Sequence, residues 1–225
     1  MNIVLFGPPG AGKGTQTNYL IKNFNLFKVS SGDILRNEIL NNSPLAKQIK
    51  STIDEGSFVS DEMINSLIEN IISNKKYINN FIFDGYPRNF KQAKNLDLLL
   101  NKYDQTISCV FYLSVSNEII TKRILGREIC SKCGQIFNKY SMPSSGNNHS
   151  CGFKYLEKRA DDNEATISKR LKTYEEETSA IIEYYKNQNL LHVVDASGEI
   201  DAIYKEILRI INVLEGWLYN FWLYK

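Results

Sequence analysis

Four glycines, a lysine and a threonine follow one another closely in the sequence near the N-terminus, in the stretch GPPGAGKGT (residues 7–15). Gly7, Gly12 and Lys13 fit the pattern G-x-x-x-x-G-K-[ST], in which backbone N–H groups surround a phosphate and the lysine reaches the outer phosphates. Gly14 stands where the hydroxyl residue is expected, and Thr15 follows one position later. The pattern predicts a phosphate-binding loop whose hydroxyl, which helps to hold Mg²⁺ in such loops, is displaced.

A carboxylate is a second candidate for holding Mg²⁺ next to the bound phosphates. Asp84 ends the apolar run FIFD (81–84) and precedes Gly85. A carboxylate at the carboxyl end of a core strand, next to a phosphate loop, commonly holds Mg²⁺. The alternative interpretation of Asp84 is a residue that merely ends a strand.

The elements that position these residues alternate between short apolar runs and longer helical patterns. Such alternation predicts an α/β fold, with a mostly parallel sheet covered on both faces and ligands at the carboxyl ends of its strands. The predicted strands are 2–6, 26–29, 81–84, 107–113 and 190–194. The predicted helices are 13–23, 32–55, 60–74, 89–101, 117–126, 163–188 and 199–214.

Three segments depart from this alternation. Residues 30–60 hold helical patterns without an apolar strand and are interpreted as a helical insertion. Residues 130–162 are rich in Ser, Asn, Gly and Cys and are interpreted as a small separate lobe. The C-terminal stretch EGWLYNFWLYK (215–225) is strongly aromatic and is interpreted as an extension packed on the protein, with a partner or membrane-surface contact as the alternative.

Composition is that of an ordinary globular protein, with 43% apolar and 23% charged residues in a chain of 225. A formal net charge of +2 gives no indication of a nucleic-acid or membrane partner. The sequence has no apolar run of membrane-spanning length, and its first residues do not have the pattern of a signal peptide. We therefore expect a cytoplasmic protein and, by default, a monomer.

Several motifs in order resemble the adenylate kinase family of nucleoside monophosphate kinases. They are GPPGAGKGT, SSGDILR (30–36), FDGYPR (83–88), KRILGR (122–127), and RADD (159–162) followed by Arg170. The resemblance covers residues 1–212 and implies a P-loop NTPase fold. It implies a core of residues 1–29, 61–126 and 163–214, an AMP-binding insertion at 30–60, a lid at 127–162 and a tail at 215–225.

The resemblance implies two nucleotide sites that face each other. The residues implied for ATP are Gly10, Ala11, Gly12, Lys13, Gly14, Thr15, Arg123, Arg127, Ile136, Phe137 and Gly198. Those implied for AMP are Ser31, Arg36, Ser57, Phe58, Val59, Gly85, Tyr86, Pro87, Arg88, Gln92, Arg159 and Arg170. In the family the glutamine matched by Gln92 reads the edge of adenine, which favours AMP over a pyrimidine monophosphate.

Transfer between two phosphates needs no strong base, because the attacking oxygen is already anionic. Alignment and cationic stabilisation supply the catalysis, and the planar, permanently charged guanidinium of arginine suits both. The catalytic residues implied by the match are Lys13, Asp84, Arg88, Arg123, Arg159 and Arg170. Arg123 and Arg127, four residues apart, would share one helix face if their helix continues that far. Asp161 and Asp162 would anchor the hinge of the lid.

The cysteines of the lid have a metal-ligand spacing. Cys130 and Cys133 form a C-x-x-C pair, and many lids of the family hold a structural zinc with two such pairs. Asn148 stands where a cysteine of the second pair belongs, three residues before Cys151. A zinc held by Cys130, Cys133, Cys151 and His149 is the expectation, and a metal-free lid is the alternative. The fourth cysteine, Cys109, is expected in a core strand.

The predicted activity is the reversible, Mg²⁺-dependent reaction of ATP with AMP to give two ADP, which maintains adenine nucleotide balance. Two alternatives stay open. The donor could be GTP, because the donor base in the family is held mostly by backbone groups, for example at Gly198. From another class, the chain could be a P-loop nucleotide-binding switch, although the AMP-site motifs would then have no purpose.

Overall fold

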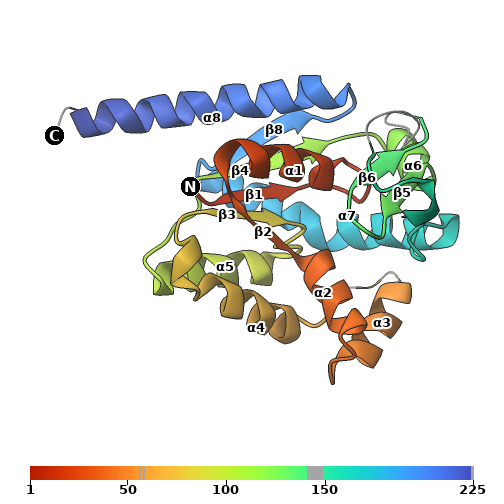
Figure 1. The fold of residues 1–225 in the computed structure, drawn as a ribbon. Coiled ribbons are helices and arrows are strands. Elements are labelled where there is room, and N and C mark those ends of the chain that lie inside the picture. The colour runs from red at the N-terminus through yellow and green to blue at the C-terminus, as the bar shows by residue number, and fades with distance from the viewer. Residues whose placement is uncertain (56, 58, 141–148, 224–225) are drawn as a thin grey trace.

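The computed structural model describes residues 1–55, 57, 59–140 and 149–223, and only the backbone of residues 179, 215 and 217–223. Within these ranges five parallel strands form a sheet in the order β2-β3-β1-β4-β8 (Figure 1). They are β1 (Ile3–Phe6), β2 (Phe27–Ser30), β3 (Phe81–Asp84), β4 (Cys109–Ser114) and β8 (Leu191–Asp195). The five predicted strands and the parallel α/β fold are therefore confirmed.

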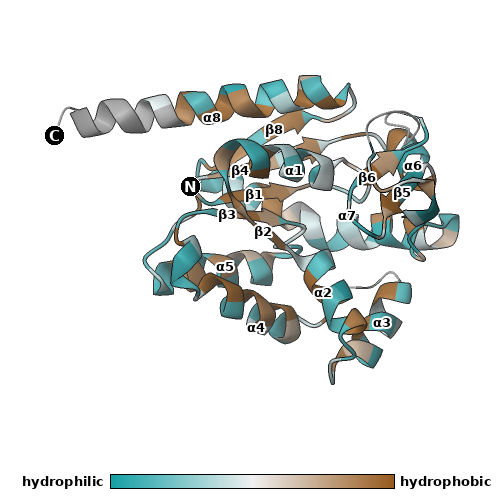
Figure 2. Ribbon diagram, viewed as in Figure 1, coloured by the Kyte–Doolittle hydropathy of each residue, from teal (hydrophilic) through white to brown (hydrophobic). Residues whose placement is uncertain are grey.

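Helices cover both faces of this sheet (Figure 1). Alternate residues of β1 point to opposite sides: Ile3 and Leu5 join one buried cluster, and Val4 joins the other. The helices over the first cluster are α1 (Lys13–Phe24) and α8 (Ile200–Leu223); those over the second are α4 (Asp61–Ile72), α5 (Phe90–Lys102) and α7 (Glu164–Asn187). Figure 2 shows brown strands at the centre, as expected when both faces are buried.

The helical insertion consists of two helices, where the sequence predicts one stretch over 32–55. They are α2 (Ser31–Leu40) and α3 (Ala46–Asp54). Between them Asn42 has a left-handed φ of 50°, and Pro44 has no N–H to continue a helix. Ser30, the last residue of β2, caps the N-terminus of α2, because its hydroxyl accepts a hydrogen bond from the N–H of Asp33.

The small lobe contains an antiparallel sheet in the order β6-β5-β7, made of β5 (Arg127–Cys130), β6 (Ile136–Asn138) and β7 (Leu156–Glu157). A short 3₁₀ turn occurs in this lobe at Phe153–Tyr155, and another lies outside it at Lys75–Tyr77. The three strands of the lobe have two to four residues each and are too short to give a periodic pattern. The preceding helix, α6 (Asn117–Leu125), ends at Gly126, so Arg123 and Arg127 do not share a helix face.

The last helix is longer than predicted. The sequence predicts a helix over 199–214, followed by a separate tail, whereas α8 continues to Leu223. In Figure 1 its C-terminal end reaches beyond the sheet. Ile203, Ile207 and Ile211 pack it onto the core. Among the described residues, every helix is too short or too polar to cross a membrane.

Candidate nucleotide and metal sites

The glycine-rich loop connects β1 to α1. Gly7, Gly10 and Gly12 have φ angles of 150°, 82° and 95°, values that side-chain-bearing residues rarely adopt. Gly12 is the N-cap of α1, and its lack of a side chain leaves the first N–H groups of the helix accessible to an anion. The Nζ atom of Lys13 donates to the carbonyl oxygens of Gly7 and Pro8, at 2.7 and 2.9 Å.

Lys13 lies among other cations. Burial lowers its pKa to about 7; Asp84 opposes this shift, and Arg88, Arg170 and Arg127 reinforce it. In this environment a lysine gains strongly from a nearby polyanion, because phosphate oxygens would offset both the burial and the repulsion.

Asp84 lies at the centre of the sheet edge. In register it pairs with Leu5 of β1 on one side and with Ser30 of β2 on the other. Its Oδ2 atom is 3.7 Å from the position that a Cβ on Gly14 would occupy, so the carboxylate faces the glycine loop. Burial raises the pKa of Asp84, and Lys13 is the strongest opposing influence. A carboxyl group held like this suits a divalent cation.

On the insertion side, Arg88 is held by three groups of its surroundings. Its Nε donates to the carbonyl oxygen of Gly85 at 2.7 Å, and its Nη2 donates to Ser31 Oγ at 3.1 Å. Its backbone N–H donates to Gln92 Oε1 at 2.8 Å. Burial lowers the pKa of Arg88 to about 10, and Arg170 is the neighbouring charge that lowers it most.

The second arginine on this side, Arg36, pairs with Asp33. Arg36 Nη2 lies 2.5 Å from one oxygen of that carboxylate, and Lys28 Nζ lies 2.6 Å from the other. Burial would raise the pKa of Asp33, but Lys28 and Arg36 lower it to about 2. Lys28 was not predicted as a site residue; its signal in the sequence is a charged residue inside a buried strand.

Gln92 is 2% exposed and has both ends of its amide engaged. Besides accepting from Arg88, it donates through Nε2 to Asp61 Oδ1 at 2.8 Å. Asn89 also donates to this oxygen, at 2.9 Å. Asp61 thus fixes the orientation of Gln92. Sequence reasoning missed Asp61, because an acidic residue in the first turn of a helix is common without any such task.

The remaining arginines come from the lid side. Arg123 Nη1 donates to the carbonyl oxygen of Ala196 at 2.7 Å. Arg127 binds both carboxylate oxygens of Asp162, and Arg170 Nη1 lies 2.8 Å from Asp161 Oδ2. The two predicted hinge carboxylates therefore pair with arginines. Burial, together with the charges of Arg127 and Arg36, lowers the pKa of Arg159 to about 10.

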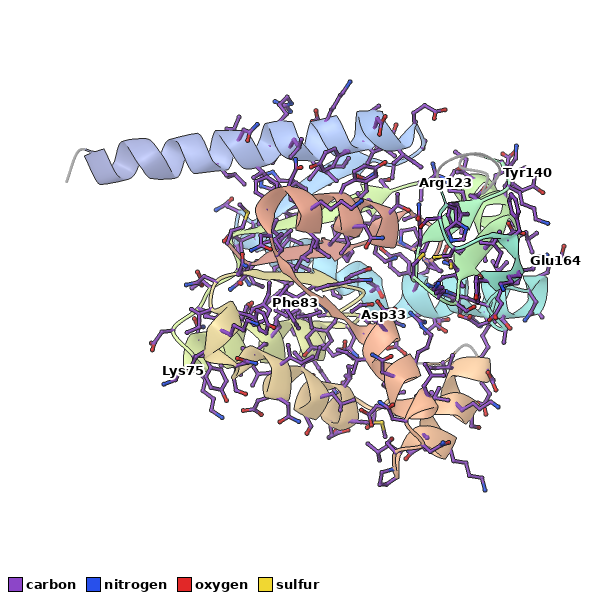
Figure 3. All side chains as sticks on the ribbon, viewed as in Figure 1. Asp33, Lys75, Phe83, Arg123, Tyr140 and Glu164 are labelled. Carbon is purple, nitrogen blue, oxygen red and sulfur yellow. The ribbon has the colours of Figure 1, made fainter. Side chains whose placement is uncertain are left out.

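Most of these groups line one cavity of about 510 Å³, within the usual range for ligand pockets, whereas Asp61 and Asp162 are not among its lining residues. Asp33, from α2, and Arg123, from α6, are labelled in Figure 3 and belong to different parts of its wall. The predicted site residues that line it are Gly10, Ala11, Gly12, Lys13, Gly14, Thr15, Ser31, Arg36, Ser57, Val59, Asp84, Gly85, Pro87, Arg88, Gln92, Arg123, Arg127, Ile136, Phe137, Arg159, Arg170 and Gly198.

One predicted AMP residue that the structure describes, Tyr86, is not among the residues that line the cavity. Tyr86 is fully buried, and its hydroxyl donates to Asn65 Oδ1 at 2.7 Å, so its side chain packs in the core instead of facing the cavity. Phe58 lies outside the described residues.

The four predicted metal ligands lie together in the lid. The sulfur atoms of Cys130, Cys133 and Cys151 and a ring nitrogen of His149 lie within 4.8 Å of one another. Cys133 Sγ is 3.8 Å from His149 Nε2. Burial would raise the pKa of Cys130, but backbone N–H groups of Cys133 and Lys132 lower it to about 6. Asn148, which stands at the position of the missing cysteine, lies outside the described residues. Cys109 is buried in β4, as expected.

Cationic residues from the glycine loop, from α2 and from the lid strand β5 line one cavity, which is more than hydrolysis requires, since hydrolysis needs one nucleotide and water. With the P-loop fold they define a phosphotransferase of the nucleoside monophosphate kinase class. Comparison with known proteins gives the particular family. Residues 5–190 match the family described as "Adenylate kinase".

Curated relatives agree over nearly the whole chain. The adenylate kinase of Pelagibacter ubique (strain HTCC1062) is 44% identical over 213 residues, which are 95% of this chain and 100% of the relative. That of Thermosipho africanus (strain TCF52B) is 38% identical over 94% of this chain and 100% of the relative. The chain belongs to the adenylate kinase family, and the predicted family and class of activity are confirmed.

Proposed function

We propose that this protein reversibly transfers the terminal phosphoryl group of ATP to AMP, giving two ADP, with the residues assigned below. The observation that carries this proposal is the convergence of Lys13 and six arginines on one cavity at the carboxyl edge of the sheet. The arginines come from α2, the segment after β3, α6, β5, the segment before α7, and α7 itself: Arg36, Arg88, Arg123, Arg127, Arg159 and Arg170.

On the donor side, the backbone N–H groups of residues 10–15 and the Nζ of Lys13 bind the phosphates of ATP. Arg123 and Arg127 neutralise them from the lid side, and Ile136 and Phe137 cover the base. The backbone of Gly198, which follows β8, borders the same pocket.

On the acceptor side, Arg36 and Arg88 bind the phosphate of AMP. Ser31 supports Arg88 through its hydroxyl, and the segments around Ser57, Val59 and Gly85 flank the nucleoside. Gln92, oriented by Asp61, uses the second N–H and the second lone pair of its amide for the edge of adenine.

Arg159 and Arg170 bridge to the phosphoryl group in transit. No base has to remove a proton, since the nucleophile is a phosphate oxygen. The residues act by alignment, by offsetting the repulsion between two polyanions, and by excluding water under the lid.

The residues around Asp84 also fit a magnesium ion bound with ATP. The carboxylate of Asp84 faces the loop, and Thr15 lines the same cavity. When bound, Mg²⁺ neutralises charge on the outer phosphates. Thr15 and Asp84 are the groups that would hold it, directly or through water.

We further propose that the chain divides into a core (1–29, 61–126 and 163–214), an AMP-binding insertion (30–60) and a lid (127–162). The separate lid sheet and the helix pair α2–α3 support this division. The aromatic segment 215–225 is proposed as a further extension beyond the core. A cytoplasmic location and a monomeric state stay predictions from composition.

Acceptor and donor preferences can be measured together. Initial rates with ATP or GTP against AMP, GMP, CMP and UMP should show AMP as the best acceptor by a wide margin. Gln92→Leu should reduce the preference for AMP about tenfold or more, because a polar reading group is lost. Gln188→Leu, at an exposed position, is the matched control. Faster phosphorylation of UMP or CMP than of AMP would contradict the role of Gln92.

The same rate measurements, with two donors and four acceptors, test both alternative functions. A GTP:AMP phosphotransferase would show a higher kcat/KM with GTP than with ATP. A nucleotide switch would hydrolyse nucleotide without dependence on AMP. The run NKYD (101–104) has the spacing of the guanine-reading NKxD pattern, but it lies at the C-terminal end of α5, where Lys102 pairs with Glu69. None of its residues is among those that line the cavity in the described structure.

We propose a structural zinc in the lid, held by Cys130, Cys133, Cys151 and His149. Three thiols and one imidazole form a closed tetrahedral set. In addition, the Nδ1 atom of His149 is buried without a hydrogen-bond partner in the described part of the chain. Native mass spectrometry should show the mass of the chain plus one zinc.

His149→Ala should weaken retention of this zinc, and His192→Ala, which changes the other histidine, should not. A mass equal to that of the bare chain, obtained without chelators, would overturn the zinc proposal and favour a metal-free lid.

A further inference from the structure

The hydroxyl of Thr178 makes an unusual contact. Thr178 lies within the 24-residue helix α7 and is 3% exposed. Its Oγ1 donates to the carbonyl oxygen of Arg88, 90 residues away in sequence, at 2.7 Å. Neither the sequence motifs nor the family resemblance assigns any part to this residue.

Three other threonines inside helices make a local bond instead. Thr52, Thr121 and Thr173 each donate to the carbonyl oxygen four residues earlier in their own helix, at 3.0 Å. This local bond is the default for a helical threonine. Thr178 instead gives its hydrogen bond to a segment outside its helix, so its hydroxyl ties α7 to the turn that follows β3.

That tie joins two arginines of the proposed transfer site. Thr178 and Arg170 are eight residues apart on α7, which places them about 12 Å apart along one rigid helix. Arg88 is fixed at its N–H by Gln92 and at its guanidinium by Gly85 and Ser31. The hydrogen bond from Thr178 fixes the carbonyl group of Arg88. It therefore ties the backbone of Arg88 to α7, the helix that carries Arg170.

Holding the two guanidinium groups in place has a physical purpose. Arg170 is the largest charged influence that lowers the pKa of Arg88, so the two cations repel each other. Arg170 is held by its ion pair with Asp161, and the neutral contacts of Arg88 help to keep that residue in place against the repulsion. A displacement of about 1 Å is enough to cost a large factor in a reaction that depends on alignment.

We propose that Thr178 is a positioning residue for phosphoryl transfer, which keeps Arg88 in register with Arg170 through its hydrogen bond to the Arg88 carbonyl. The proposal rests on the proposed roles of these two arginines. The hydroxyl acts on the protein backbone and does not need to touch either nucleotide.

The test compares Thr178→Val, which loses the hydroxyl at nearly constant volume, with Thr178→Ser, which keeps it. We expect Val to lower kcat about tenfold to a hundredfold while the KM for ATP changes less than about threefold. Ser should stay within about threefold of the parent chain. Thr173→Val, which removes a local bond on the same helix, is the matched control and should leave kcat unchanged.

Three outcomes would overturn the inference. One is a kcat of Thr178→Val equal to that of the parent; another is an equal loss of kcat in Thr178→Ser, which would indicate packing and not the hydrogen bond. Failure of both Thr178→Val and Thr178→Ala to fold would indicate a purely structural residue. Arg88→Lys distinguishes a failure of the proposed role of Arg88 from a failure of the role of Thr178. If Arg88→Lys keeps full activity, the proposed role of Arg88 is wrong. If Arg88→Lys loses activity and Thr178→Val does not, only the role of Thr178 is wrong.

Discussion

Single side chains in this site are held by more contacts than their motifs suggest. Arg88 uses its N–H, its carbonyl and its guanidinium, and each has a different partner. The sequence identifies Arg88 through the motif FDGYPR, but it cannot identify Thr178 or Asp61, which act across long sequence separations. Residues that touch a ligand leave a pattern, while those that hold them in place are identified only once the chain is folded.

Lys13 provides a prediction that depends on pH. Its pKa of about 7 in the protein means that Lys13 is mostly neutral at about pH 8. Bound phosphates raise this pKa, so ATP binding at about pH 8 should take up a proton, and binding below about pH 6 should not. Calorimetry in two buffers with different ionisation enthalpies measures this uptake.

Lys13→Met should abolish the uptake, and Lys22→Met, on the same helix, should keep it. Equal proton uptake by the parent chain and Lys13→Met at about pH 8 would assign the titration to another group.

Two glycines of the loop allow a matched comparison of stability. A Cβ on Gly7 would lie 2.6 Å from the carbonyl oxygen of Leu113, a backbone atom that cannot move aside, whereas a Cβ on Gly12 would meet nothing within 4 Å. Gly12→Ala should therefore cost only the backbone strain of a positive φ, about 1–2 kcal/mol. Gly7→Ala should cost more. Urea unfolding measures both, and a smaller loss for Gly7→Ala would contradict the steric argument.

At the scale of elements, the five core strands follow from their apolar runs, because a strand buried on both faces has no polar side. The break between α2 and α3 was missed, although Asn42 and Pro44 were available as signals. The lid strands could not be predicted, since pairing between them, and not their composition, defines them. The placement of Arg127 follows from this: it begins β5 and does not extend α6.

The long α8 leads to a truncation experiment. The described side chains that seat it on the core end at Leu214, and two relatives match over their whole length with 94% or 95% of this chain. A chain that ends at Leu214 should keep kcat/KM within about twofold and lose less than about 1 kcal/mol of unfolding free energy.

A chain that ends at Arg209 is the contrast. It lacks the buried Ile211 and should lose about 2–5 kcal/mol, the usual cost of removing such a contact. Equal losses for the two chains, measured by thermal unfolding, would show that residues 215–225 stabilise the core.

For the whole molecule, the small net charge conceals an uneven distribution of charge between the cavity and the rest of the protein. Among the described residues, nine cationic and four acidic side chains line the cavity, an excess of five, whereas the complete chain carries a formal +2. The rest of the protein is therefore negative overall. Composition alone could not reveal this separation of charge, because only folding gathers the arginines of six segments into one place.

Because the cavity holds excess positive charge, a polyanion that lacks a nucleobase should stabilise the fold. Tripolyphosphate at about 100 times its Kd should add about 2.7 kcal/mol, which raises Tm by about 5–10 °C for a chain of this length. Differential scanning calorimetry measures the shift. Sodium chloride of equal ionic strength should have little effect, and an equal rise with both salts would exclude specific occupation of the cavity.

The meeting of β1, β2 and β3 at Asp84 has a consequence for how this scaffold can diversify. The glycine loop, Lys13 and Asp84 start from the shared sheet edge, while the segments proposed to flank or cover the nucleosides, around Ser57 and Val59 and at Ile136 and Phe137, belong to the insertion and the lid. A lineage could therefore vary those segments around an unchanged sheet edge, provided that Arg36, which the insertion itself carries, is kept. Chimeric proteins that exchange residues 30–60 between relatives offer a direct way to observe such modular inheritance.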